Sequence, residues 1–187
     1  MTDGWTQESS PFHEGEHRIQ ERAGVRDRAE MQGRCVIRDQ LPDQHREFYE
    51  SLPFLLLGSV DSQGRPWASL VAGPQGFIES PDATRLHLNA PLLPGDPLQR
   101  SLHEGADLGV IGLEPATRRR NRFNGKAGTV SNRGFEIHVD QSFGNCPKFI
   151  QTRDVTYIAP SGKGQAPETR DADLSDIDVQ RVIATAD

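Results

Sequence analysis

The stretch from Phe54 to Ala72 constrains the fold more than any other part of the chain. An apolar run that ends at Val60 is followed by the sequence Asp61-Ser62-Gln63-Gly64 and then by a second run that begins at Arg65. Aspartate at the first position of a four-residue turn and glycine at the last are typical of a type I turn between two strands. The stretch therefore predicts a β-hairpin. Its continuous apolar start also predicts that the first strand is covered on both faces.

Further short strands are predicted along the rest of the chain. They span 76–79, 85–89, 108–113, 126–130, 135–139 and 155–158. The segments 126–130 and 135–139 flank Ser131-Asn132-Arg133-Gly134, which predicts an antiparallel pair joined by a tight turn. Six to eight short strands with turns every eight to twelve residues are typical of an antiparallel barrel. The predicted fold class is therefore mainly β with flanking helices.

Few segments predict helices. Helical patterns cover 13–31, 42–52, 97–103 and 174–186, and a single helical turn is predicted at 144–150. The first of these belongs to a polar arm, 1–40, whose charged residues predict a solvated helix or an arm that packs on a partner subunit. Proline, glycine and serine in 159–173 indicate a linker. The predicted organisation is arm 1–40, barrel domain 41–158, linker 159–173 and C-terminal helix 174–187.

The composition limits the class of protein. The chain has 187 residues, enough for one domain with a core, but only 34% are hydrophobic and the mean hydropathy of -0.63 is low for a compact domain of this size. This deficit indicates exposed segments or an interface with another chain. The formal net charge of -6 argues against general nucleic-acid binding, which depends on neutralising phosphates with lysine and arginine.

Targeting signals and cysteine frameworks are both missing from the sequence. The first sixteen residues have neither a basic start nor an apolar stretch, and the longest apolar run, Phe54 to Leu57, is too short to cross a bilayer. Cys35 and Cys146 lie 111 positions apart, which fits neither a disulfide framework nor a zinc module. These features predict a cytoplasmic protein with no membrane association.

A basic stretch stands out against the acidic balance of the chain. Residues 118–126 read Arg-Arg-Arg-Asn-Arg-Phe-Asn-Gly-Lys and contain five cations. Strand alternation would place Arg118, Arg120 and Arg122 on one face, with Arg119 and Asn121 on the other. Arginines on one face can bind a phosphate, and asparagine or backbone N–H groups can complete its shell. A small anionic ligand and a solvated or interface-forming face both remain open at this point.

No catalytic constellation stands out in the sequence. Serine, cysteine and histidine do not occur in nucleophile-elbow, zinc-protease or CxxC settings, and the six scattered histidines propose no metal site. His45 lies among polar residues and is predicted to face solvent, while His87 is predicted to be a satisfied or exposed strand residue. Cys146 precedes Pro147 and Lys148, so it is interpreted as a buried structural residue, with a reactive thiol as the alternative.

Three motifs resemble one protein family. The hairpin from Phe54 to Ser69 resembles the opening of pyridoxamine 5'-phosphate oxidase-like, FMN-binding split-barrel proteins. The stretch Arg118-Arg-Arg-Asn-Arg-Phe-Asn-Gly125 and the stretch Gln141-Ser-Phe-Gly-Asn-Cys-Pro-Lys-Phe-Ile-Gln151 resemble a bacterial branch of that family. The resemblance runs from about Leu41 to Gln151, and longer members of the branch continue beyond a helix like 174–186.

The resemblance implies a six-stranded split barrel, a homodimer, and FMN at the interface between subunits; FAD, F420 and haem stay open as cofactors. The isoalloxazine would lie near Trp67 and Ser69. The residues that would contact or lie near its phosphate are Arg118, Arg120, Asn121, Arg122, Asn124, Lys126 and Lys148. Because a flavin carries out its own redox chemistry, such a protein needs no separate catalytic side chain. A flavin-dependent oxidoreductase is the first functional hypothesis.

The sequence departs from the family pattern at two places. Typical members supply an arginine from the second hairpin strand, where this chain has Ser69-Leu70-Val71, and a cation from the next loop, where residues 89–96 contain none. The second hypothesis is therefore a non-catalytic barrel that serves as a dimerisation or docking half without flavin.

Overall fold

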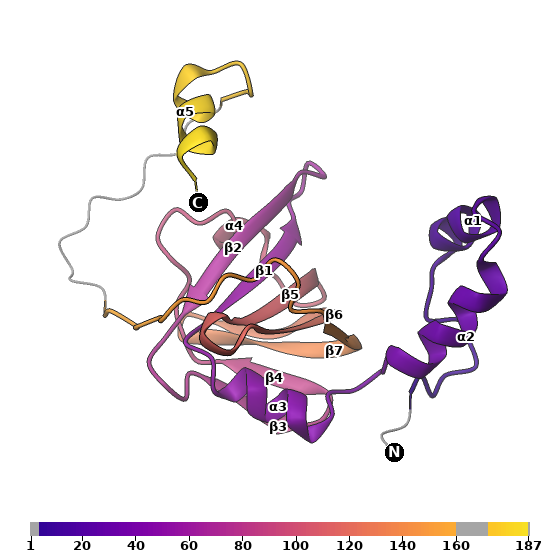
Figure 1. The fold of residues 1–187 in the computed structure, drawn as a ribbon. Coiled ribbons are helices and arrows are strands. Elements are labelled where there is room, and N and C mark those ends of the chain that lie inside the picture. The colour runs from indigo at the N-terminus through magenta and orange to yellow at the C-terminus, as the bar shows by residue number, and fades with distance from the viewer. Residues whose placement is uncertain (1–3, 160–171, 187) are drawn as a thin grey trace.

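The computed structural model describes residues 4–159 and 172–186, which form one antiparallel sheet with flanking helices (Figure 1). The strands are β1 (Phe54–Val60), β2 (Pro66–Ala72), β3 (Ile78–Asp82), β4 (Arg85–Leu88), β5 (Asp107–Glu114), β6 (Arg119–Ser131) and β7 (Gly134–Asn145). Their order in the sheet is β2-β1-β5-β6-β7-β4-β3. The mainly β, barrel-like class is confirmed, with seven strands where the resemblance implied six.

Local turn chemistry forms the first hairpin as the sequence predicts. Asp61 Oδ1 accepts hydrogen bonds from the backbone N–H groups of Gln63 and Arg65, and its carbonyl accepts one from Gly64. Gly64 has a φ of 78°, a conformation that glycine adopts without strain. Strand β1 is nevertheless covered on one face only, because Leu55 and Leu57 are buried while the residues that alternate with them are not.

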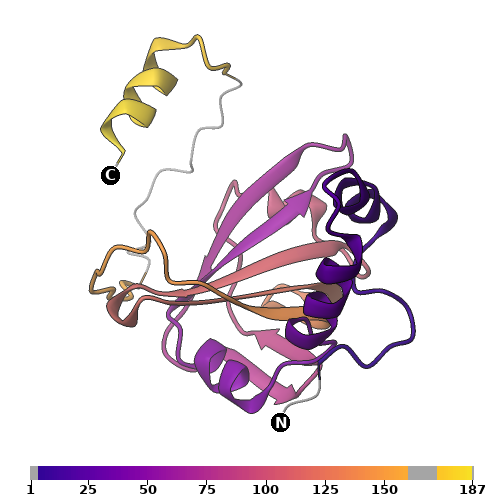
Figure 2. The same cartoon turned by 45° about the vertical axis from the view of Figure 1, so that its right-hand side comes forward.

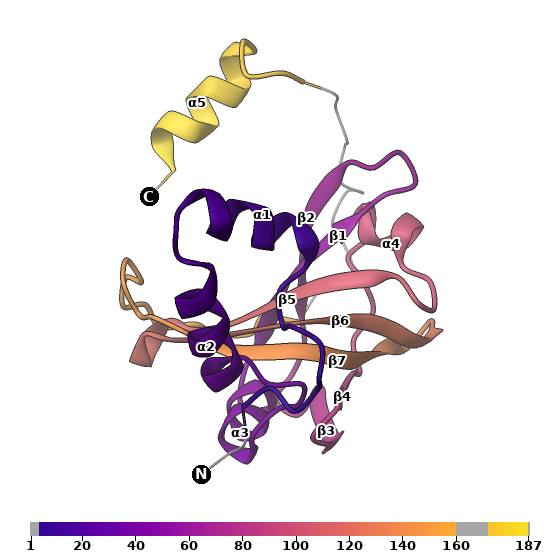
Figure 3. The ribbon, with the colours of Figure 1, turned by 90° about the vertical axis from the view of Figure 1, so that its right-hand side faces the viewer.

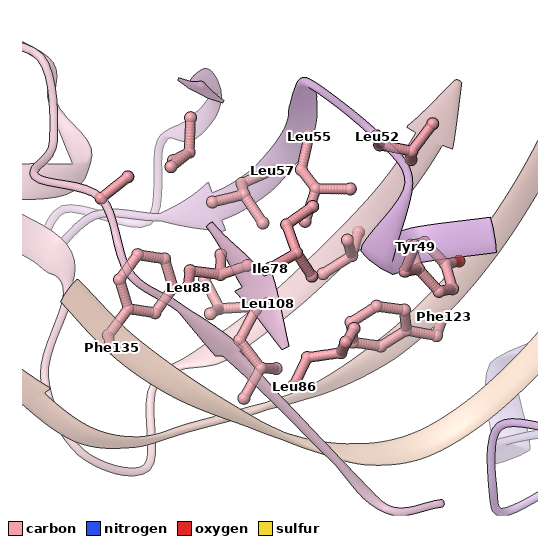
Figure 4. Packing of buried hydrophobic residues seen from close by; sticks show 14 of the residues in the cluster. Tyr49, Leu52, Leu55, Leu57, Ile78, Leu86, Leu88, Leu108, Phe123 and Phe135 are labelled. Atoms are coloured by element: carbon pink, nitrogen blue, oxygen red, sulfur yellow. The ribbon is translucent and has the colours of Figure 1, made fainter. Parts of the chain in front are cut away.

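The core lies on the inner face of the sheet, beneath helix α3 (Asp43–Glu50) (Figure 4). Phe48 and Tyr49 of α3 are fully buried, and the Tyr49 ring meets Phe123 of β6 edge-on with centroids 5.3 Å apart. Gly112 on β5 lies under these rings, because an added Cβ would come within 2.6 Å of Tyr49 Cε1. Leu55, Ile78, Leu86, Leu88 and Leu108 continue the same packing along the sheet.

The ribbon of β6 and β7 is the longest part of the sheet. The predicted pair across Ser131–Gly134 is confirmed, and β6 also includes most of the basic stretch. The helical turn predicted at 144–150 is wrong, because β7 continues to Asn145, where it pairs with Arg120. The strand predicted at 155–158 is also wrong, since this segment pairs with no strand in the described residues.

The arm forms two helices where the sequence predicts one. Helix α1 (Glu14–Arg22) and helix α2 (Arg26–Val36) are separated by Gly24, whose φ of 67° ends the first helix. Figures 2 and 3 show the arm beside β6 and β7. A polar network holds it together: Glu30 accepts hydrogen bonds from Ser10, Arg26 and Arg34.

Two more helices complete the described chain. Helix α4 (Leu98–Ser101) confirms the short helix predicted near 97–103, and helix α5 (Ile177–Thr185) lies within the predicted C-terminal helix. Most of the predicted linker 159–173 lies outside the described residues. No helix in the described ranges is both long enough and apolar enough to span a membrane.

Candidate functional site

The outer face of the sheet carries the polar side chains of the basic stretch. Along β6, Phe123 points into the core, so Arg120, Arg122, Asn124 and Lys126 alternate onto the opposite face. Asn121 shares the inward side with Phe123. Arg118 precedes the strand and has a left-handed backbone with φ 58°. The structure therefore brings together four of the seven residues assigned to the phosphate.

Most cations of the stretch are already engaged within the chain. Arg118 and Arg120 donate hydrogen bonds to the carbonyls of Pro147 and Cys146, at 3.5 and 2.9 Å. The guanidinium of Arg119 lies 4.8 Å above the Phe48 ring, on the core side of the sheet. These three arginines hold the loop after β7 and the end of the core in place.

Both lysines assigned to the phosphate also have partners. Lys126 Nζ lies 2.5 Å from Asp107 Oδ1, and the hydrogen bond and charge of Asp107 raise the pKa of Lys126 above its usual value. Lys148 lies in the loop after β7, 5.1 Å from the centre of the Phe149 ring. The positive charge of Lys126 is therefore largely balanced before any ligand arrives.

Arg122 is an outer-face cation whose contact in the described residues is an aromatic ring. Its guanidinium lies 4.8 Å above the Phe143 ring, and it forms no ion pair with any residue in 4–159 or 172–186. On one side it belongs to a cross-strand row with Ile111 and Phe143. The neighbouring row contains Asn124 and Gln141, whose amide groups can donate further hydrogen bonds.

A trough of about 480 Å³ lies on the outer face next to Arg122. Its floor contains Gly58 and Gly109, which face each other across β1 and β5, and Asn124 lies at its end. An added Cβ at Gly109 would meet only Asn124 Oδ1, at 3.8 Å, so the floor is open backbone that a flat ligand can approach. Ser59 also lines the trough, but its hydroxyl is on the inner face with Leu55 and Leu57, where it is buried without a hydrogen-bond partner in the described residues.

A groove of about 460 Å³ adjoins the trough, between the arm and strands β6 and β7. Arg122, Asn124, Gln141 and Phe143 form its sheet side. The arm side is mainly apolar and consists of Pro11, Phe12, Ala29, Gly33, Val36 and Ile37, with Glu16 and Gln32 as its polar members. Gln141 Nε2 donates a 2.6 Å hydrogen bond to the Pro11 carbonyl and so joins the two sides. Asn124 lines both hollows and marks where they meet.

Trp67 and Ser69, assigned to the isoalloxazine, belong to the same face of β2 and have different hydrogen-bond partners. Trp67 lines the trough, and its indole N–H donates to Asp61 Oδ2 at 2.9 Å, which holds the pKa of Asp61 well below its usual range. Ser69 is buried on the inner face and donates to Asp96 Oδ1 at 2.6 Å. Trp67 alternates with Ser69 onto the same face of β2, although Trp67 also lines the trough, which Ser69 does not.

The sequence did not predict several residues that line the trough and the groove. Glycines inside strands, such as Gly58 and Gly109, are a signal of close backbone approach that could have pointed to the trough. Gln141 lies in a motif that the sequence analysis singled out, but its role as the bridge to the arm depends on a contact across 130 positions. The arm residues had no local signal, because only tertiary structure places them over the sheet.

Two single-residue predictions were wrong. Cys146 is exposed, since it lies in the surface loop after β7 and not in the core. His45 is half-buried on α3, and burial together with the charges of Arg38 and Arg119 lowers its pKa. The described residues contain no group of three or more side chains suited to hold a metal ion.

Comparisons with known proteins add little to this geometry. No protein-family model matches the chain, and no curated protein matches it in sequence. A solved structure of HupZ from Group A Streptococcus is similar to 56% of this chain and 99% of that chain, with 13% sequence identity and a TM-score of 0.43. Similarity at this level says nothing about what the present chain binds.

Proposed function

We propose that the outer face of the sheet binds FMN and that the protein is a flavoprotein. The observation that carries this proposal is Arg122, a guanidinium without a carboxylate partner in the described residues, placed beside a trough with a flat backbone floor. A phosphate group binds favourably to such a guanidinium. The side-chain amides of Asn124 and Gln141 can donate further hydrogen bonds to the same phosphate. The family resemblance of the two motifs in β6 and β7 points to the same ligand.

The residues of the trough fit the flat part of the cofactor. Gly58 and Gly109 leave the backbone of the floor accessible to a flat ring. Trp67 stands at the rim, held in orientation by Asp61. When bound, the flavin would supply the redox chemistry, while these residues would position it and exclude water.

The test is the absorbance spectrum of the purified chain before and after FMN is added and the mixture is desalted. We expect the visible flavin bands to remain with the wild-type chain. Arg122→Ala should weaken FMN binding by at least about tenfold, because a hydrogen-bonded charge pair contributes roughly 1.5–3 kcal/mol. Arg133→Ala, in the β6–β7 turn, is the matched control and should retain the flavin.

A colourless chain that stays colourless after FMN would refute the flavoprotein proposal. The second candidate function would then remain, a non-catalytic docking half. It is favoured because Arg118, Arg120 and Lys126 already have partners within the chain and are less available to a phosphate. The homodimer implied by the resemblance stays a prediction, and the sedimentation behaviour of the purified chain would test it. FAD and F420 would be added in parallel, and haem separately, to identify the cofactor.

A further inference from the structure

Helix α5 exposes an apolar stripe that nothing in the described structure buries. Val182 and Ile183 are 66% and 58% exposed, Val179 lies on the same side of the helix, and no residue of α5 is buried. Figures 1 and 3 show the helix standing apart from the sheet. A helix of nine residues is marginal in water by itself, so its stability must come from packing against another surface.

The outer face of the sheet offers a partly exposed apolar surface. Leu70, Leu56 and Ile111 form one cross-strand row on β2, β1 and β5. The arm lies over β6 and β7 and contributes no residue to the trough beside this row. Leu70 is 39% exposed, and Val60 on the same face of β1 is 59% exposed. The arm therefore covers the outer face over β6 and β7, whereas on β1, β2 and β5 Leu70 and Val60 are exposed and Leu56 and Ile111 are half-buried.

The apolar stripe of α5 and the apolar row on the sheet are similar in length. Nine residues give a helix about 13 Å long, and three neighbouring strands span about 10 Å between the outer two, so α5 can lie across the row. An apolar helix stripe on an apolar sheet face is the usual way in which both are removed from water. Docked there, α5 would lie alongside the trough floor of Gly58 and Gly109, in the row that Arg122 continues on β6.

The length of chain between the sheet and α5 determines whether the row is occupied by the helix of the same chain or by that of a second copy. The 18 residues from 159 to 176 can span at most about 60 Å, so reach does not limit docking within one chain. A covalent connection of this length can hold a segment at an effective concentration on the order of millimolar, far above micromolar protein in solution. The helix of the same chain therefore outcompetes a second copy.

We propose that α5 docks on the outer face of its own sheet, across Leu70, Leu56 and Ile111. The proposal is independent of FMN, since it concerns the surface beside the trough and not the ligand in it. The docked helix would cover apolar side chains that are otherwise exposed on both α5 and the sheet.

Hydrogen exchange of the full chain at several protein concentrations tests the proposal. We expect the amides of α5 to exchange at least about tenfold more slowly than those of the same segment as a free peptide, at every concentration. Leu70→Asp and Ile183→Asp should each abolish this protection. Val130→Asp is the control, because Val130 is equally exposed, at 40%, but lies at the far end of β6.

Three outcomes would overturn the proposal. The first is exchange of α5 at the free-peptide rate, and the second is protection that survives both Leu70→Asp and Ile183→Asp. The third is protection that appears only as the chain dimerises, which would assign the row to a second copy. Cross-linking separates the last case directly: L70C with I183C, in a chain carrying C35S and C146S, should give a disulfide within one chain and not between two.

Discussion

The inner and outer faces of the sheet consist of alternate residues of the same strands, yet they are built on different chemistry. On β6, Phe123 is completely buried, whereas Arg122 beside it faces a groove and has only an aromatic ring beneath it. On β5, Gly112 leaves room for core rings, whereas Gly109 leaves an open floor on the surface. The inner face is closely packed, whereas the outer face has unfilled space above its backbone.

This difference separates stability from binding within single strands. A change on the inner face must disturb side chains that already touch, so its cost appears in the free energy of unfolding. A change on the outer face meets space or solvent, so its cost should appear mainly in ligand affinity. Substitutions of the same type on the two faces can therefore test the assignment of roles.

The largest effect is expected for Phe123→Ala. The substitution removes a fully buried ring in contact with Tyr49 and should lower the free energy of unfolding by about 3–5 kcal/mol. Phe143→Ala, on the outer face of β7, should cost about 1 kcal/mol, mainly through the lost contact with Arg122. Urea unfolding measures both, and equal losses would contradict the division between the faces.

A glycine pair on β5 gives the next largest effect. Gly112→Ala places a methyl group within 2.6 Å of Tyr49 Cε1 and 2.8 Å of Phe48 Cε1, so it should destabilise the fold by about 1–3 kcal/mol. Gly109→Ala has room and should leave stability nearly unchanged, but its methyl group enters the trough and should weaken FMN binding. Urea unfolding and FMN titration of the two variants should give opposite rankings.

The arm supplies a smaller, pH-dependent effect. A hydrogen bond from Ser10, with those from Arg26 and Arg34, lowers the pKa of Glu30 from 4.5 to about 2. Because the folded pKa is depressed, the stabilisation is complete above about pH 4.5 and is lost as pH falls toward 2. Trp5, which donates to the carbonyls of Arg34 and Ser9, should report this loosening by fluorescence in a Trp67→Phe chain.

Glu30→Gln is the matched variant for this measurement. It removes the charge without changing the size of the side chain, so the arm should be looser at neutral pH and its fluorescence should no longer change between pH 4.5 and 2. An unchanged pH profile in Glu30→Gln would show that another group governs the arm.

Local chemistry explains what the sequence could predict. Asp61 and Gly64 define their turn within four residues, and the turn at Ser131–Gly134 is equally local, so both hairpins were predictable. Alternation alone placed Arg120 and Arg122 on one face. These features depend on neighbours in the chain, and they set most of the sheet.

The remaining features depend on contacts between distant segments. The groove exists because the arm lies over β6 and β7, joined by Gln141 and Pro11, and no pattern in residues 4–37 encodes that position. The helical turn predicted at 144–150 failed because pairing with Arg120 extends β7. The candidate site was thus predicted on its sheet side and missed on its arm side.

The strand order also determines when the protein can fold during synthesis. The hairpins β1–β2 and β3–β4 are made first, but they occupy opposite edges of the sheet and share no strand pairing. Strands β5, β6 and β7, made later, connect them. A growing chain that ends before Asp107 therefore carries two separate hairpins with exposed edges, a state prone to pairing with other chains. The sheet can close only after Asn145 has left the ribosome, so slow synthesis of the second half would prolong the most vulnerable stage.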